Sequence, residues 1–391
     1  MKILVALSRF PWPIEKGDKL RAFYQIQGLA EEHEVHLVTL NDAPVSAEDR
    51  AQLDFCASVT VIPHGKLRIG WNLAGAVFNG KPFQVNYFRS PAMKRAMRRV
   101  IQEQKIDVVY VQLIRLGMNL GFEEHVGWML DYMDAFSIGM KNRIAGSKFP
   151  KKPFVKSEAR RLEVYEAGIA ARFDELSIIS ERDADALPEA VRKSTHIIPN
   201  GVGESFFEEL PRPTQPDFDL IFFGNMGYHP NVRSAAFLLE EVMPALKAKG
   251  HDLHLCIAGA RPAPLIRAAA GPKVEVTGFV DDIRTWILRS KLAIAPLIAG
   301  QGLQNKLLES MAMGLPTLTT PLANSALHAV HGEHLMVCDS PETFAEAIVE
   351  LLADPEKAAR IGAAGKAFVE ERYRWTAMNR RLIAALEACR K

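Results

Sequence analysis

Short apolar runs alternate with longer segments of helical spacing along most of the chain. The first run, KILVALS at residues 2–8, is followed by apolar side chains at Leu20, Phe23, Ile26 and Leu29, spaced as on one face of a helix. Runs that are apolar throughout, rather than alternately apolar and polar, indicate parallel strands in a sheet covered on both faces. Further runs of this kind lie at 34–40, 59–64, 106–113, 127–134 and 173–180.

The alternation is interrupted by EELPRPTQPDFD at 208–219, a polar segment with three prolines that is typical of a linker. We therefore predict an α/β protein with two doubly wound, Rossmann-like domains, residues 1–207 and residues 217–373. Ligands in such folds bind at the carboxyl ends of the strands, so we expect a ligand in a central cleft that the domains face. The final segment, 374–391, is expected to form a helix that packs back on the first domain. The apolar runs after the linker lie at 220–225, 253–259, 274–279, 292–297, 316–321 and 334–338.

The composition is that of a globular protein. With 391 residues, 48% hydrophobic and 24% charged, the chain is long enough for roughly two or three domains with cores of their own. A net charge of +2 gives no reason to expect a nucleic-acid partner. The four cysteines lie far apart, as is typical of reduced thiols in a cytosolic protein. No apolar stretch reaches the ~18 residues that span a bilayer, and the N-terminus reads as a strand rather than a signal peptide.

The stretch GQGLQNKLLESMAMGLP, at residues 300–316, combines a glycine-containing loop with the start of a helix. Backbone amides of such a loop, the helix N-terminus and Lys306 together suit a phosphate. Glu309, one turn later, can accept hydrogen bonds from both hydroxyls of a ribose. These features describe a nucleotide diphosphate site, although a structural strand–loop–helix junction explains the same residues equally well. The Walker order is absent and no G-x-G-x-x-G follows the first strand, which disfavours a dehydrogenase.

The same stretch resembles the donor-site signature of glycosyltransferase family 4, whose members are retaining transferases with the GT-B fold. That signature has a Glu, seven residues, a second Glu, then Ala-Met-Ala and Gly-x-Pro-Val. Glu309 matches the second Glu, and Gln301 takes the place of the first. The resemblance extends over the whole chain through FPWPIEKGDKLRAFYQIQGLAEEHEVHLVTL at 10–40, IIPNGV at 197–202 and FFGNMGYHPN at 222–231, and its polysaccharide-assembly branch is the most similar.

The resemblance implies that the second domain binds the donor and the first domain binds the acceptor. Glu309 would bind the ribose and Lys306 the diphosphate, whereas Gln301 would stand where relatives contact sugar hydroxyls. Many relatives place an Arg and a Lys after FFG, but NMGYHPN has neither charge here, so Lys306 would carry more of the neutralisation. The expected donor-binding residues are Gly17, Asn225, Phe279, Val280, Gly302, Leu303, Gln304, Asn305, Lys306 and Glu309.

The implied reaction moves a sugar from a nucleotide-diphosphate donor to a glycan or lipid-linked acceptor in cell-surface or exopolysaccharide assembly. We expect a hexosyltransferase-like, retaining enzyme that needs no metal and no cofactor, with Lys306, Gln301 and Asp134 as catalytic candidates. Asp134 follows a strand of the first domain and is a candidate acceptor contact. The sequences DAD at 183–185 and DFD at 217–219 mimic a metal motif, but we expect a helix start and a linker there.

Residues 65–105 mix basic side chains with Trp71, Phe78, Phe83 and Phe88. Such a segment can rest on anionic lipid head groups at the inner face of the plasma membrane. It can equally be a solvated helix face with its aromatic side chains in the core. Two other functions also stay open: a nucleotide-sugar epimerase of the same fold, and a non-catalytic subunit of a polysaccharide assembly complex.

Overall fold

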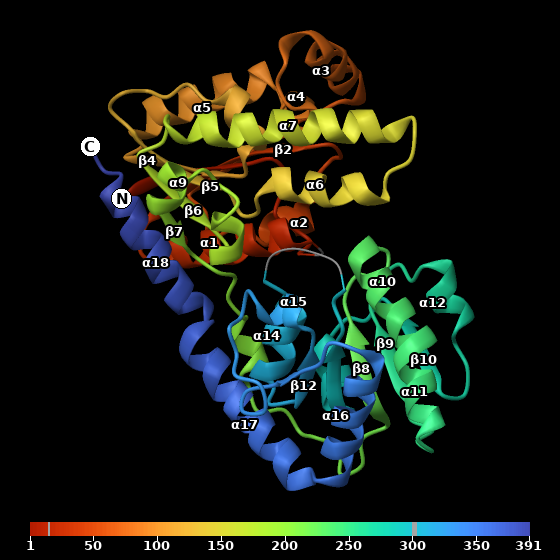
Figure 1. Cartoon of the computed structure of the whole chain (residues 1–391). Helices are drawn as coiled ribbons and strands as arrows, with labels where there is room; N and C mark the ends of the chain where they lie inside the picture. Colours follow the sequence, from red (N-terminus) through yellow and green to blue (C-terminus); the bar gives the residue numbers. More distant parts are fainter. Residues whose placement is uncertain (15, 299–302) are drawn as a thin grey trace. The chain divides into compact units, whose positions relative to one another are not determined.

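The structure is a computed structural model of the chain, and it describes residues 1–14, 16–298 and 303–391. Two compact units are present, each built on a parallel sheet (Figure 1). The first unit contains Met1–Pro199 and Trp375–Lys391, and the second contains Asn200–Arg374. The predicted α/β fold with two doubly wound, Rossmann-like halves is confirmed.

The sheet of the first unit has β1 near its centre, in the order β3-β2-β1-β4-β5-β6-β7. The chain builds outward from β1 to β3 and then returns to the other side of β1 with β4. All six neighbouring pairs are parallel, so the carboxyl ends of the strands share one edge. The strands are β1 (Lys2–Leu7), β2 (Glu34–Asn41), β3 (Ser58–Pro63), β4 (Val108–Gln112), β5 (Gly127–Asp131), β6 (Glu175–Ile178) and β7 (Thr195–Ile197).

Helices cover both faces of this sheet because alternate residues of each strand point in opposite directions. Ile3 and Val5 pack among side chains of α1 and α18, whereas Leu4 and Ala6 pack with α5 and α7. The helices are α1 (Gly17–Ala30), α2 (Ala47–Ala51), α3 (Lys66–Asn79), α4 (Phe83–Tyr87), α5 (Pro91–Gln104), η1 (Ile114–Asn119), α6 (Phe136–Gly146), α7 (Lys151–Ala170), α8 (Glu181–Ala184), α9 (Glu189–Lys193) and α18 (Trp375–Ala388).

The sheet of the second unit repeats this plan, in the order β10-β9-β8-β11-β12-β13. Leu220 and Phe222 of β8 face one core, and Ile221 and Phe223 face the other. The strands are β8 (Phe218–Phe223), β9 (Leu255–Ala258), β10 (Val274–Gly278), β11 (Ser290–Ala295), β12 (Thr317–Thr319) and β13 (Met336–Val337). The helices are η2 (Glu204–Phe206), α10 (His229–Phe237), η3 (Leu238–Val242), α11 (Met243–Ala248), α12 (Pro264–Ala268), α13 (Ile283–Leu288), α14 (Asn305–Ala312), α15 (Pro321–Asn324), α16 (Pro341–Ala353) and α17 (Pro355–Arg372).

The division between the units lies after Pro199, earlier than the predicted boundary at 207. The predicted linker, 208–219, belongs to the second unit because it packs there. Arg212 donates a hydrogen bond to the carbonyl of Met313, and Leu210 packs beside the cluster that contains Ile221. The prolines disfavour helix and strand in this segment, but its residues still pack against the second unit.

The C-terminal helix α18 packs on α1, and its apolar face completes one core of the first unit (Figure 1). Trp375 stacks on Tyr24 with ring centroids 5.3 Å apart, and Asn379 donates to the carbonyl of Tyr24 at 3.0 Å. The helices meet closely at Gly28, where an added Cβ would lie 1.8 Å from Nδ2 of Asn379. Among the helices of the described ranges, none is long and apolar enough to cross a membrane.

Gly28→Ala should therefore destabilise the protein by ~1–3 kcal/mol, because the methyl group overpacks the α1–α18 contact. Denaturant unfolding measures this loss. Adding Asn379→Ala to Gly28→Ala should recover part of the stability, since it removes the amide that the methyl group meets. Purely additive losses in the double variant would contradict this account of the contact.

Candidate active site

The carboxyl edge of the second sheet has a topological switch point between β8 and β11. The chain leaves β8 toward β9 and β10, then returns on the other side of β8 with β11. Loops that follow the two strands diverge at such a point, which creates room for a ligand. The loop after β8 leads into α10, and α14 is the next helix along the chain after β11.

The backbone is tightly packed where β8 and β9 end. Gly224 and Gly259 have φ of 138° and 133°, and a Cβ on Gly259 would lie 1.8 Å from the carbonyl oxygen of Gly224. Residues with a side chain rarely adopt such φ values, and at Gly259 a side chain would also collide with backbone. The two glycines therefore allow the loop after β8 to pass close to the sheet edge.

Lys306, on the first turn of α14, reaches across to the first turn of α10. Its Nζ donates to Oδ1 of Asn231 at 2.8 Å and lies 5.4 Å from the ring centroid of Phe222. Asn231 in turn donates from Nδ2 to the carbonyl of Asn225 at 2.9 Å. The sequence did not single out Asn231, whose only signal was its place in the FFGNMGYHPN segment.

Lys306 and Glu309 are half-buried, and burial governs their protonation. Loss of solvent lowers the pKa of Lys306 to about 8, and the carboxylate of Glu309 opposes this shift. Burial likewise raises the pKa of Glu309 to about 7, against the attraction of Lys306. At neutral pH the site thus keeps an ammonium group whose charge is poorly solvated, and which an anion would stabilise.

The remaining donor-site candidates lie along the same edge of the second sheet. Oδ1 of Asn225 accepts from the amide of Gly227 at 3.0 Å, and Oδ1 of Asn305 accepts from Nδ2 of Asn200 at 3.1 Å. Leu303 is buried, and Gln304 directly precedes α14. Phe279 is 68% exposed, and Val280 beside it is half-buried, just after β10. The predicted residues Gln301 and Gly302 lie outside the described residues.

Gly17 and Asp134, the candidates in the first unit, lie near each other. Gly17 begins α1, and an added Cβ there would contact Cε of Met133 at 3.5 Å. Asp134 is half-buried after β5. Burial, with the nearby carboxylate of Asp183, raises the pKa of Asp134 to about 7, although Arg21 and Arg115 oppose this shift. Asp134 can therefore hold or release a proton near neutral pH.

Arg115, at the same edge, is a residue that the sequence analysis did not single out. Its guanidinium lies over the rings of Phe88 and Phe136, at 5.4 and 4.7 Å from the centroids. Its NH1 is 3.6 Å from the carboxylate of Asp18, and no hydrogen-bond partner for its buried Nε lies within the described ranges. Burial lowers the pKa of Arg115 to about 10, so it stays charged at neutral pH and can bind an anion.

The two aspartate pairs that mimic a metal motif have structural partners. Asp183 accepts a hydrogen bond from Ser180 at the start of α8, and Asp219 forms an ion pair with Lys291 at 2.8 Å. Asp185 and Asp217 likewise pair with arginines. Over the residues with described positions, no group of three or more His, Cys, Asp or Glu side chains could hold a metal ion.

The position of Lys306 and Glu309 at this switch point falls inside a segment that has a known counterpart. Residues 217–354 match the model of the family described as Glycosyl transferases group 1. The matched segment contains Asn225, Asn231, Phe279, Lys306 and Glu309. Gly17 and Asp134 lie outside the matched residues.

Two curated proteins are similar to this chain. An "uncharacterized 44.6 kDa protein in cps region" of Klebsiella pneumoniae is 21% identical over 95% of this chain and 96% of its own length. A GDP-mannose-dependent monoacylated alpha-(1-6)-phosphatidylinositol monomannoside mannosyltransferase of Corynebacterium glutamicum is 28% identical over 200 residues, which are 50% of this chain and 46% of that protein.

Solved structures match the fold over nearly the full length. Sucrose-phosphate synthase of Thermosynechococcus elongatus superposes with a TM-score of 0.68 at 16% identity, covering 98% of this chain and 100% of that one. Anabaena HepE in complex with UDP-glucose superposes with a TM-score of 0.67 at 15% identity, covering 99% and 100%. The chain therefore has the GT-B architecture, and the segment that matches the group 1 family lies in its second half.

The coupling between the two ionisable groups of the matched segment can be measured directly. Glu309→Gln should lower the pKa of Lys306 below about 8, because it removes the attraction of Glu309 that opposes burial there. An NMR titration of the lysine Cε signals reports this pKa. Glu275→Gln, at an exposed position of β10, should leave it unchanged. A Lys306 pKa that rises or stays constant in Glu309→Gln would contradict the assignment.

Proposed function

We propose that this protein is a retaining glycosyltransferase that moves a sugar from a nucleotide-diphosphate donor to a glycan or lipid-linked acceptor. One observation carries the proposal: Lys306 and Glu309 lie on the first turns of α14 at the β8–β11 switch point, inside the segment that matches the group 1 family. Anabaena HepE, whose fold is similar, has been solved in complex with UDP and with UDP-glucose.

In this proposal the donor diphosphate lies against the start of α14 and the loop after β8. Lys306 and the helix N-terminus supply positive charge, and the loop after β8 passes close to Lys306, since an added Cβ on Gly224 would lie 3.4 Å from Cε of Lys306. Glu309 accepts hydrogen bonds from the ribose hydroxyls. Gln301 and Gly302 complete the phosphate and sugar contacts, and the backbone of Phe279 and Val280 contacts the base.

The proposed reaction breaks the bond between the anomeric carbon and the β-phosphate oxygen, and the electron pair stays on the nucleotide diphosphate. The acceptor hydroxyl forms the new bond on the same face, and its proton passes to the departing phosphate. Lys306 and the dipole of α14 stabilise the charge that grows on the leaving group, which is the part of catalysis that fixed charges perform best. No metal is required in this proposal, because these groups provide the positive charge.

The acceptor belongs to the first unit, where Asp134 can accept a hydrogen bond from a sugar hydroxyl. We propose cell-surface or exopolysaccharide assembly at the inner face of the plasma membrane as the setting. The relative from Klebsiella pneumoniae in its cps region and the mannosyltransferase that acts on a phosphatidylinositol monomannoside support this choice. Residues 65–105 would then contact anionic lipid.

Calorimetry with UDP, GDP, ADP and dTDP tests the donor site. We expect one nucleotide to bind selectively, and Glu309→Ala to weaken it by about 10- to 100-fold through the loss of charged hydrogen bonds to ribose. Glu275→Ala, a matched change at an exposed carboxylate, should bind like the wild type. If none of the four binds, the transferase proposal fails and a non-catalytic subunit becomes the better account. Product analysis with the sugar form of the selected nucleotide separates transfer from epimerisation.

Nucleotide affinity should also depend on pH through Lys306. A diphosphate favours the ammonium form, so binding holds a proton on Lys306 and weakens once the pH passes the free pKa of about 8. From about pH 7.5 to about pH 9 the affinity should fall by about tenfold in the wild type. Lys306→Arg stays charged throughout this range and should show a flat profile. An equal decline in both proteins would assign the pH dependence to another group.

A further inference from the structure

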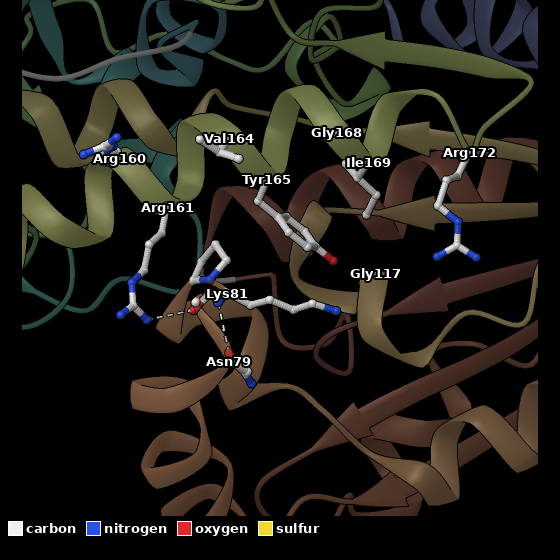
Figure 2. A pocket seen from close by; sticks show the side chains of 12 residues that line it. Asn79, Lys81, Gly117, Arg160, Arg161, Val164, Tyr165, Gly168, Ile169 and Arg172 are labelled. Carbon is white, nitrogen blue, oxygen red and sulfur yellow. Dashed lines mark hydrogen bonds between the residues drawn. The ribbon is translucent and has the colours of Figure 1, made fainter.

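A cavity of about 480 Å³ lies in the first unit, between α7 and the turn that joins α3 to α4 (Figure 2). Its wall is strongly cationic, since Lys81, Arg160, Arg161 and Arg172 all line it. Tyr165 and Val164 of α7 contribute aromatic and apolar surface. None of these side chains has a part in the proposed donor site, which belongs to the other unit.

Four basic side chains line this cavity, and no acidic side chain does among the residues that the structure describes. Across the described part of the chain, Lys81, Arg160 and Arg172 form no ion pair. Of the three carboxylates on α7, Glu158 accepts from two backbone amides at the start of α4. Glu163 pairs with Lys141, and Glu166 accepts from the amide of Ser137. The cavity therefore has a net positive charge that an anion would compensate.

Arg161 connects the cavity to helix α3. Its NH1 donates to the carbonyls of Ala76 and Lys81, at 2.6 and 3.2 Å, and its guanidinium lies 5.1 Å from the ring centroid of Phe83. These contacts hold the end of α3 at the rim. The cavity and the helix therefore form one continuous surface of the first unit.

Helix α3 exposes an apolar stripe next to this cationic cavity. Leu67, Trp71 and Phe78 are 86%, 81% and 90% exposed, and their spacing places them on one face of the helix. Ala76 is the one buried residue of α3, and the helix contains no acidic residue. By contrast, Phe88 of the same basic segment is buried in the core. Within 65–105, α3 therefore fits the lipid-contacting alternative, whereas Phe88 fits the alternative with aromatic side chains in the core.

We propose that the cavity binds the phosphate group of an anionic membrane phospholipid, while α3 lies in the bilayer interface with its apolar stripe among the acyl chains. An interfacial helix of this kind has exposed large apolar side chains beside basic ones. Charge complementarity favours a lipid over an apolar protein partner, because basic side chains line the cavity at the C-terminal end of α3. The proposal names the site for the membrane contact proposed above and is independent of sugar transfer.

The glycines of the cavity allow a test that changes no charge. Gly117 is required for packing, since an added Cβ would lie 2.3 Å from the Tyr165 hydroxyl. Gly168 also lines the cavity, but no atom lies within 4 Å of an added Cβ there. Gly168→Leu can therefore fill the cavity while α7 keeps its contacts. Gly146, on α6, has the same free space outside the cavity and provides the matched control, Gly146→Leu.

Vesicle flotation tests the proposal with the full chain. We expect the wild type to bind phosphatidylcholine vesicles that contain phosphatidylglycerol, and to bind less to vesicles given equal negative charge by oleate. Gly168→Leu and Lys81→Gln should weaken binding by about tenfold, whereas Gly146→Leu should bind like the wild type. Soluble glycerol 3-phosphate should not replace the lipid as a ligand.

Three results would overturn the proposal. Unchanged binding of Gly168→Leu would show that the cavity holds no head group. Equal binding to oleate and phosphatidylglycerol vesicles would show that the protein responds to the negative charge of the surface and not to a phosphate head group. Binding of glycerol 3-phosphate without any vesicle binding would assign the cavity to a soluble phosphate. Nucleotide calorimetry on the same variants separates the two proposals, because Gly168→Leu should keep donor affinity whether or not it binds vesicles.

Discussion

Arg21 and Asp131 form an ion pair that is completely buried, with Nε 2.6 Å from Oδ2 and NH2 3.1 Å from Oδ1. A buried charge without its partner is severely destabilising, so the fold is stable only when the elements that carry the two residues are packed together. Asp131 ends β5 and also meets Tyr110 of β4 and Ser177 of β6, while Arg21 comes from α1. The pair thereby fixes the carboxyl edge of the first sheet, where Gly17, Arg115 and Asp134 lie.

In the second unit, close backbone packing and the ammonium group of Lys306 hold the carboxyl edge of the sheet together. Gly224 and Gly259 let two strand ends approach within contact distance, and Lys306 then joins α14 to the loop after β8 through Asn231. Burial weakens the hold of Lys306 on its proton, whereas the site needs that charge to attract a phosphate. A bound anion would stabilise the ammonium form of Lys306. Without the anion, burying this charge costs stability, although the proposed function requires the charge.

Basic side chains of the first unit gather in two separate places. Arg115 is buried against aromatic rings at the strand ends, where it can meet a ligand. Lys81, Arg160 and Arg172 line a cavity beside the exposed apolar face of α3. The near-zero net charge of the chain hides both features, because acidic residues elsewhere cancel these local concentrations.

The sequence by itself determined the alternation of strands and helices, the two doubly wound halves, and the pairing of Lys306 with Glu309 on one helix turn. These follow from periodicity and from neighbours a few residues apart, which local patterns report. The tertiary structure alone decided that Asn231 is the partner of Lys306, that 208–219 packs within the second unit, and that α3 is exposed while Phe88 is buried. Such facts depend on side chains distant along the chain that fold into contact, and neither composition nor spacing carries that information.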